Sequence, residues 1–193
     1  MAVQKNIGKN TIGDNKKMEV DLRSIIMSMT YCMCGDYDYY VYVEQDALLS
    51  GEIIKKAIEE SQNKGAVFGY SKQTGYQMQV SFFVIKQSLI KSFLSKLYAI
   101  EKLDSQISPE NKVTLALSKL NFFPLSVLFS FSDRVTAKVF KIINRFSILR
   151  NYDYLSFGYG RERPIDFKDD IFYFQHGSKE ELEKYLKIHS QKN

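Results

Sequence analysis

The chain has 193 residues and a mass of 22.4 kDa, the size of one large domain or two very small ones. Its composition, 45% hydrophobic and 25% charged, excludes a disordered or collagen-like protein. Two cysteines are too few for a disulfide framework, and the N-terminus has no hydrophobic signal region, so we expect a cytoplasmic protein. The most apolar window, residues 122–131, is too short to cross a membrane.

The basic residues are unevenly distributed along the chain. The net charge is +5, and residues 119–150 carry all of it, with six basic side chains and one acidic side chain. Four of the basic residues fall on one face of a predicted helix: Arg134, Lys138, Lys141 and Arg145. Such a helix is typical of a solvated surface over an ordinary core, but it could also contact an anionic membrane or a phosphate-bearing partner. The aromatic residues lie in apolar runs rather than among basic residues, so we expect no nucleic-acid partner.

Hydrophobic spacing predicts helices that alternate with strands. The predicted helices cover residues 18–33, 50–63, 88–100, a segment that begins at Ser108, the basic segment 134–150, and residues 179–189 at the C-terminus. The predicted strands cover residues 37–43, 66–70 and 80–85, and residues 1–17 and 71–77 are expected to be loops. This order predicts an α/β fold in one domain over 1–193, with a mixed, mostly parallel sheet flanked by helices.

Two carboxylates follow the first predicted strand. The run of Tyr and Val in residues 37–43 is typical of a strand buried on both faces, and it ends at Glu44-Gln45-Asp46. Residues two apart on a strand face the same side, so both carboxylates are expected to share one space at the end of the sheet where ligands bind. Oxygen donors there suit Mg²⁺ or Mn²⁺ bound to phosphate. The alternative is an acidic strand end that caps the next helix.

Several segments resemble glycosyltransferases of the GT-A fold, family-2-like in type. The loop Asn6-Ile-Gly-Lys-Asn, a helix and a strand ending in Glu44-Gln45-Asp46 resemble the family's N-x-G loop and its D-x-D motif, which holds a metal ion and a sugar nucleotide. Ser108-Pro-Glu-Asn-Lys and Phe157-Gly-Tyr-Gly-Arg-Glu-Arg-Pro extend the resemblance, which covers roughly residues 5–175. The motif begins with Glu rather than Asp. The family's nucleotide-binding strands are missing before Asn6, so we expect a truncated or partner-completed fold with an uncovered sheet edge.

The resemblance implies transfer of a sugar, of hexosyltransferase type, from a nucleotide-sugar donor to a glycan or glycolipid acceptor in surface polysaccharide biosynthesis. Asp46, assisted by Glu44, would hold Mn²⁺ or Mg²⁺ and the donor diphosphate. His176, after an aromatic run, is a candidate late metal ligand, or else a hydrogen-bonded residue at a strand end.

Three further residues are candidates for the reaction. Arg161 and Arg163 lie in a Gly-rich basic loop that could close over the diphosphate, or pair at the surface with Glu162 or Asp166. Glu110 is the candidate catalytic base, or else a carboxylate that stabilises a helix N-terminus.

A second function of a different class remains open from the sequence. The chain could be a non-catalytic α/β module that docks on an anionic membrane or a partner through the basic helix 134–150. In either case we expect a cytoplasmic location with peripheral contact at the inner face of the membrane, and a partner chain or oligomer is compatible with both.

Overall fold

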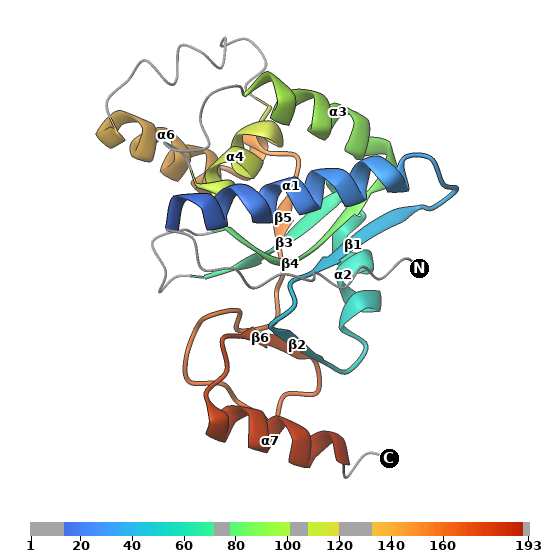
Figure 1. Cartoon of the computed structure of the whole chain (residues 1–193), viewed down its shortest axis with the longest axis vertical. Coiled ribbons are helices and arrows are strands. Elements are labelled where there is room, and N and C mark those ends of the chain that lie inside the picture. The colour runs from blue at the N-terminus through green and yellow to red at the C-terminus, as the bar shows by residue number, and fades with distance from the viewer. Residues whose placement is uncertain (1–13, 72–77, 101–107, 120–132, 191–193) are drawn as a thin grey trace.

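The computed structural model describes residues 14–71, 78–100, 108–119 and 133–190. In chain order its elements are α1 (Asp14–Cys32), β1 (Tyr39–Val43), β2 (Ala47–Ser50), α2 (Ile53–Ser61), β3 (Ala66–Tyr70), β4 (Met78–Lys86), α3 (Gln87–Ala99), α4 (Pro109–Ala116), α6 (Asp133–Arg145), the 3₁₀ turn η1 (Ser147–Leu149), β5 (Asp153–Tyr154), β6 (Phe172–Gln175) and α7 (Lys179–Ser190) (Figure 1). The predicted Asn6 loop, the apolar window 122–131 and most of the predicted loop 71–77 lie outside the described residues.

The main sheet has four strands in the order β1-β4-β3-β5. β4 is antiparallel to both β1 and β3, and only the pairing of β3 with β5 is parallel. The predicted α/β class with a mixed sheet is confirmed, but the prediction that the sheet is mostly parallel is wrong. Seven residues join β3 to β4, whereas a parallel crossover needs about a dozen or more, so the two strands form an antiparallel pair.

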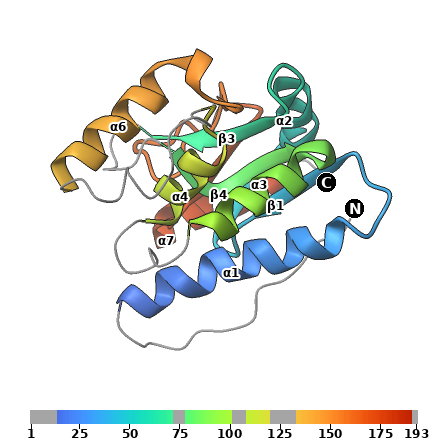
Figure 2. The ribbon, with the colours of Figure 1, turned by 90° about the horizontal axis from the view of Figure 1, so that it is seen from above.

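Both faces of this sheet are buried, because side chains alternate between two hydrophobic clusters. On β4, Phe83 and Ile85 join the cluster that packs under α1, α3, α4 and α6, whereas Phe82 and Val84 join the cluster under α2. Figures 1 and 2 show these four helices together on one side of the sheet. In β1 only Tyr40 is fully buried and the other four residues are half-buried, so the prediction that strand 37–43 is buried on both faces is confirmed only in part.

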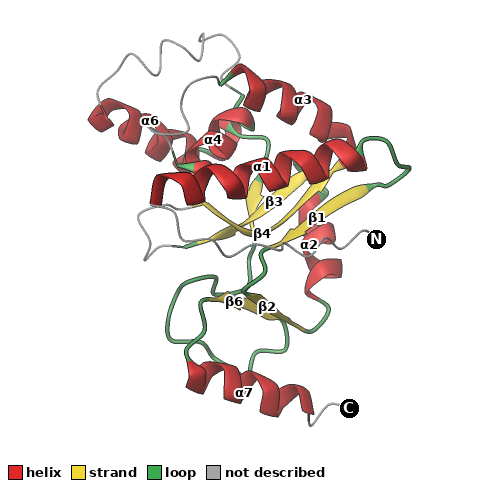
Figure 3. Cartoon of the chain, viewed as in Figure 1, coloured by secondary structure: helices red, strands yellow, loops and turns green. Residues whose placement is uncertain are grey.

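A second, smaller sheet lies beyond the end of β1. β2 pairs with β6 in antiparallel register from Ala47 with Gln175 to Ser50 with Phe172. Figure 3 shows this pair of strands between the main sheet and α7. Tyr185 of α7 donates a hydrogen bond of 2.5 Å to the carbonyl oxygen of Leu49, which fastens α7 to the small sheet.

Local capping signals place two helix starts correctly. The Ser108 hydroxyl accepts the amide of Asn111 at the start of α4. Ser178 and Glu181 form a reciprocal capping box before α7. The predicted start of the helix 50–63 is wrong, because Ser50 ends β2 and α2 begins at Ile53.

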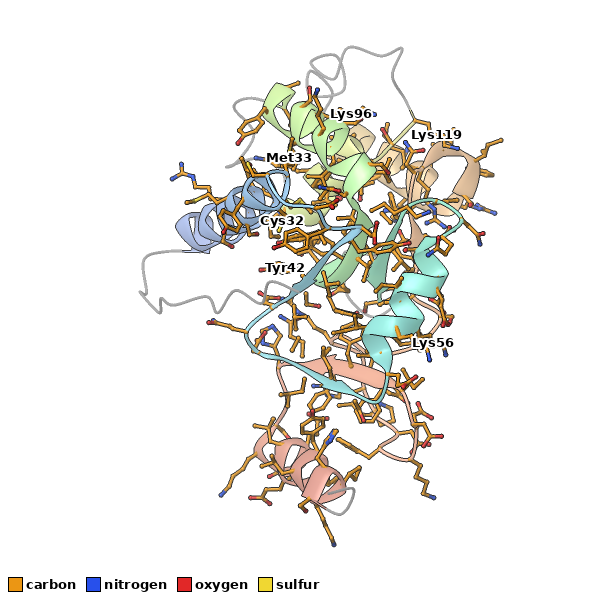
Figure 4. All side chains as sticks on the ribbon, turned by 90° about the vertical axis from the view of Figure 1, so that its right-hand side faces the viewer. Cys32, Met33, Tyr42, Lys56, Lys96 and Lys119 are labelled. Carbon is orange, nitrogen blue, oxygen red and sulfur yellow. The ribbon has the colours of Figure 1, made fainter. Side chains whose placement is uncertain are left out.

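Two helix boundaries and the burial of one cysteine also differ from what the sequence suggests. α1 begins at Asp14 rather than residue 18. The predicted basic helix 134–150 is α6, which ends at Arg145 and is followed by η1. Cys34, which we expected in the core at a helix end, is exposed beyond α1, whereas Cys32 is half-buried and packs on the core; Figure 4 shows it at the end of α1.

Candidate functional site

The two predicted carboxylates sit in a tight turn that leaves β1. The Glu44 amide donates to the Ser81 carbonyl of β4 at 2.8 Å, and the Ala47 amide donates back to the Glu44 carbonyl at 3.0 Å. Glu44-Gln45-Asp46-Ala47 is therefore a β-turn. The carboxylates do share one space, as predicted, but the reason given was wrong: the turn brings them together, not the alternation of side chains along a strand.

Strand pairing then brings a histidine to the turn. Because Ala47 lies opposite Gln175 in the small sheet, Asp46 and His176 are the next neighbours beyond this pair. Nδ1 of His176 lies 2.8 Å from Oδ2 of Asp46. The side chains of Asp46 and His176 are 38% and 52% exposed, so a ligand from solvent can reach both.

The backbone of His176 is unusual for a residue with a side chain. Its φ of 55° lies in the left-handed region, which residues other than glycine adopt at a cost of about 1–3 kcal/mol. Such residues cluster at functional sites, where the surroundings hold them in place. Here Arg163 donates to the His176 carbonyl at 3.2 Å and to the Gln175 carbonyl at 2.9 Å. These two bonds fix the backbone where the chain leaves the end of β6.

The centre of the site is Gln175, which the sequence analysis did not identify. Its side chain is fully buried, and its Nε2 donates to Oε2 of Glu44 at 2.5 Å and to Oδ1 of Asp46 at 3.0 Å. Its Oε1 accepts a hydrogen bond of 3.3 Å from Nε of Arg161. One buried amide therefore joins both carboxylates to a guanidinium. A polar residue that ends the aromatic run Phe172-Tyr-Phe, directly before a histidine, was the available signal.

The basic loop is tied to the same strand. The backbone N–H of Gln175 donates to the backbone carbonyl of Gly160 at 2.7 Å, and Gly160 directly precedes Arg161. Arg163 forms an ion pair with Glu181 of α7, with Nε 2.6 Å from Oε1. Glu181 was not among the partners that the sequence suggested for this loop. Both arginines thus lie beside the carboxylates, and Arg163 links them to the first turn of α7.

A buried tyrosine packs beneath this arrangement. Tyr173 of β6 is 1% exposed, and burial raises the pKa of its phenol well above the usual range. A Cβ atom at Gly69 or Gly158 would overlap its ring or hydroxyl, and Gly158 also has a φ of 93°. The glycines therefore let β3 and the basic loop approach Tyr173 closely.

Glu110, the candidate base, is the one predicted site residue outside this network in the part of the chain that the structure describes. It is half-buried in the first turn of α4, and this helix packs against β4, α1, α3 and α6. Its neighbourhood is the helical layer of the main sheet, whereas the carboxylates adjoin the small sheet (Figure 1).

The possible metal ligands of this site are few. They suit a cation that binds together with a phosphate better than a cation held by the protein alone. Among the described residues there is no cluster of three or more His, Cys, Asp or Glu side chains that could hold a metal ion. Asp46 and His176 form a pair, and Glu44 is held by Gln175. Mg²⁺ and Mn²⁺ are commonly bound through one or two carboxylates together with substrate phosphates, and Asp46 offers one such carboxylate beside His176.

Comparisons of the chain with protein-family profiles, with curated proteins and with solved structures found no match. The chemistry of the site therefore rests on its own residues and on the resemblance of its motifs.

Proposed function

We propose that this chain is a glycosyltransferase of GT-A-like fold, or a truncated relative, that transfers a sugar from a nucleotide-sugar donor to a glycan or glycolipid acceptor. The supporting observation is the site itself: Gln175 joins Glu44 and Asp46, while His176 and Arg161 adjoin the same group. Acidic, imidazole and guanidinium side chains in one place match the needs of a diphosphate bound with a divalent cation.

In this proposal the residues of the site act on the leaving diphosphate. Asp46 and His176 would hold Mn²⁺ or Mg²⁺, which supplies positive charge where negative charge grows on the departing diphosphate. Arg161 adds hydrogen-bond donors for its oxygens, while Arg163 holds the turn at His176 and pairs with Glu181. Gln175 keeps Glu44 and Asp46 oriented, so little rearrangement is needed as charge develops.

The transfer step moves one proton and one glycosyl group. The acceptor hydroxyl oxygen forms a bond to the anomeric carbon as the bond from that carbon to the diphosphate oxygen breaks. In an inverting reaction a carboxylate takes the hydroxyl proton. Glu110 lies at the start of α4, in the helical layer of the main sheet and outside the network of carboxylates, so we do not assign it this role. Replacing Glu110 by Gln should leave both donor binding and transfer intact; loss of transfer with intact donor binding would show that Glu110 is the base.

The nucleotide base needs a further part of the fold. β1 is an edge strand of the four-stranded sheet in the described part of the chain. We propose that the base-binding half is added beside β1, by further residues or by a partner chain. We also place the enzyme in the cytoplasm, in peripheral contact with the inner face of the membrane.

Calorimetric titration with a panel of nucleotide sugars, with and without Mn²⁺, tests the proposal. We expect Mn²⁺-dependent binding of a donor that Asp46→Ala abolishes and that His176→Ala weakens. Glu52→Ala is the matched control, because it also removes one exposed carboxylate but lies at the start of α2, paired with Lys55. Donor binding that does not require Mn²⁺, or an equal loss in the Glu52 and Asp46 variants, would refute the proposal.

A further inference from the structure

α6 combines basic and apolar side chains on its exposed side. Around the helix, Phe140 and Ile143 are buried in the core, 5% and 0% exposed. The opposite sector carries Lys138, Lys141 and Arg145, all exposed. At 100° per residue these three positions span about 60° of the helix circumference, so they form one stripe. The basic face predicted from the sequence is therefore present over the part of α6 whose side chains the structure describes.

Apolar side chains stand in and next to the same stripe. Ile142 and Phe146 are each 50% exposed, and Ile148 in η1 is 78% exposed. By helical geometry Ile142 lies about 40° outside the stripe on the Lys138 side, and Phe146 directly follows the end of α6 at Arg145. We call these exposed residues of α6 and η1 the α6 surface: Lys138, Lys141, Ile142, Arg145, Phe146 and Ile148.

The charge of this surface is of one sign. Residues 138–150 contain four basic residues and no acidic residue. Lys119 adds another exposed cation to this surface. Its backbone N–H donates to the Leu149 carbonyl at 2.8 Å, which places Lys119 beside η1 and next to α6 (Figure 4). α7 provides the contrast within the same chain: its exposed lysines are interspersed with Glu180, Glu181 and Glu183.

We propose that the α6 surface binds the surface of an anionic lipid bilayer. A helix with basic residues beside exposed Ile and Phe lies in the headgroup region, where the cations meet anionic lipids and the apolar side chains enter the acyl boundary. None of the described helices is both long and apolar enough to cross a membrane, so the contact is peripheral.

Other occupants fit the α6 surface less well. A second copy meeting the same surface through a two-fold axis would place its lysines against one another. Single-stranded nucleic acid binds through aromatic stacking, and of the three exposed apolar residues two are Ile. A bilayer is the partner that uses both the cations and the aliphatic groups.

Co-sedimentation of the full chain with vesicles tests the inference. We expect binding to phosphatidylcholine vesicles that contain phosphatidylserine, weaker binding at high salt, and little binding to phosphatidylcholine alone. Each basic residue near an anionic surface contributes about five-fold in affinity, so Lys138→Gln/Lys141→Gln/Arg145→Gln should bind roughly 100-fold more weakly. The matched control is Lys179→Gln/Lys184→Gln/Lys187→Gln, which removes the same charge from α7 and should bind like the unmodified chain.

A second variant separates insertion from simple charge attraction. Ile142→Ser/Phe146→Ser keeps every charge and should weaken binding at all salt concentrations; Leu182→Ser/Leu186→Ser on α7 is its control, and circular dichroism checks that each variant is folded.

The inference is overturned if folded protein does not sediment with anionic vesicles. Equal losses in the α6 and α7 charge variants would also overturn it, as would concentration-dependent dimerisation or oligonucleotide binding that depends on the same residues while vesicle binding does not. The measurement requires no sugar donor, so its outcome is independent of the transferase proposal.

Discussion

Replacing Gln175 by Leu tests the central contact of the candidate site. Leu keeps most of the buried volume of the side chain but removes the amide, so Glu44 and Asp46 lose a shared donor and Arg161 loses an acceptor. Because the site of the side chain is fully buried, no water can take the place of the amide without rearrangement. The carboxylates of Glu44 and Asp46 then face each other without the hydrogen-bond donor that lay between them.

The expected cost follows from these bonds. A hydrogen bond to a charged group contributes about 1.5–3 kcal/mol, so the two bonds to the carboxylates set a limit of about 6 kcal/mol. The third bond, of 3.3 Å from the exposed Arg161, adds little because Arg161 can turn to water. Asp46 is 38% exposed and can regain water, which reduces its share. We therefore expect Gln175→Leu to lower the free energy of unfolding by about 2–3 kcal/mol.

Urea denaturation of the unmodified and variant chains measures this change. Gln62→Leu is the matched control, because Gln62 is exposed and donates a single hydrogen bond of 2.5 Å to the Tyr39 hydroxyl, so its loss should cost less than about 1 kcal/mol. A double-mutant cycle with Asp46→Asn should give a coupling energy of at least about 0.5 kcal/mol. Equal costs at Gln175 and Gln62, with no coupling to Asp46, would show that the buried amide does not organise the carboxylates.

Three other substitutions have defined outcomes. Gly69→Ala should destabilise the fold by about 1–3 kcal/mol, because the added Cβ would overlap the Tyr173 hydroxyl. Tyr173→Phe in the same chain should recover part of this loss, as measured by urea denaturation. If no stability is recovered, the contact does not cause the loss. Burial raises the pKa of Tyr40 from 10.0 to about 12, so the stability that its neutral form provides is complete below pH 10 and is lost as the pH rises through about 12; this amounts to about 3 kcal/mol. Tyr40→Phe should remove that part of the alkaline loss of stability, and an identical loss in both proteins between about pH 9 and pH 12 would refute the assignment. Ser178→Ala should cost α7 about 1 kcal/mol by breaking the capping box, seen as faster amide hydrogen exchange in α7 than in α3; unchanged exchange would show that Glu181 alone caps the helix.

Local sequence signals were sufficient for most elements of the main sheet and its helices. β3 begins and ends at the predicted residues 66 and 70, and Ser108 and Ser178 cap the helices they were expected to cap. Such signals depend on residues that are neighbours in the sequence, so they can be recognised without knowing the fold. The direction of strand pairing is not local, and this is why a mixed, mostly antiparallel sheet was predicted as mostly parallel.

Short strands were the elements that the sequence did not predict. β2 has four residues and lies just before α2, so its last residue, Ser50, was assigned to the predicted helix 50–63. β5 has two residues and exists only through its pairing with Val67 and Phe68. A strand of this length has no periodicity of its own to detect, because its conformation is imposed by the partner strand.

The same dependence on pairing explains the candidate site. The sequence identified Glu44, Asp46 and His176, but it placed the first two by strand alternation and left the histidine unconnected. What joins them is the β2–β6 register, which sets Ala47 opposite Gln175 across a sequence separation of about 130 residues. A one-residue shift of that register would turn Gln175 away from both carboxylates. The informative motif is therefore two segments together, Glu44-Gln45-Asp46 and Gln175-His176, because the contacts of Gln175 and His176 with the carboxylates form only when the two segments pair.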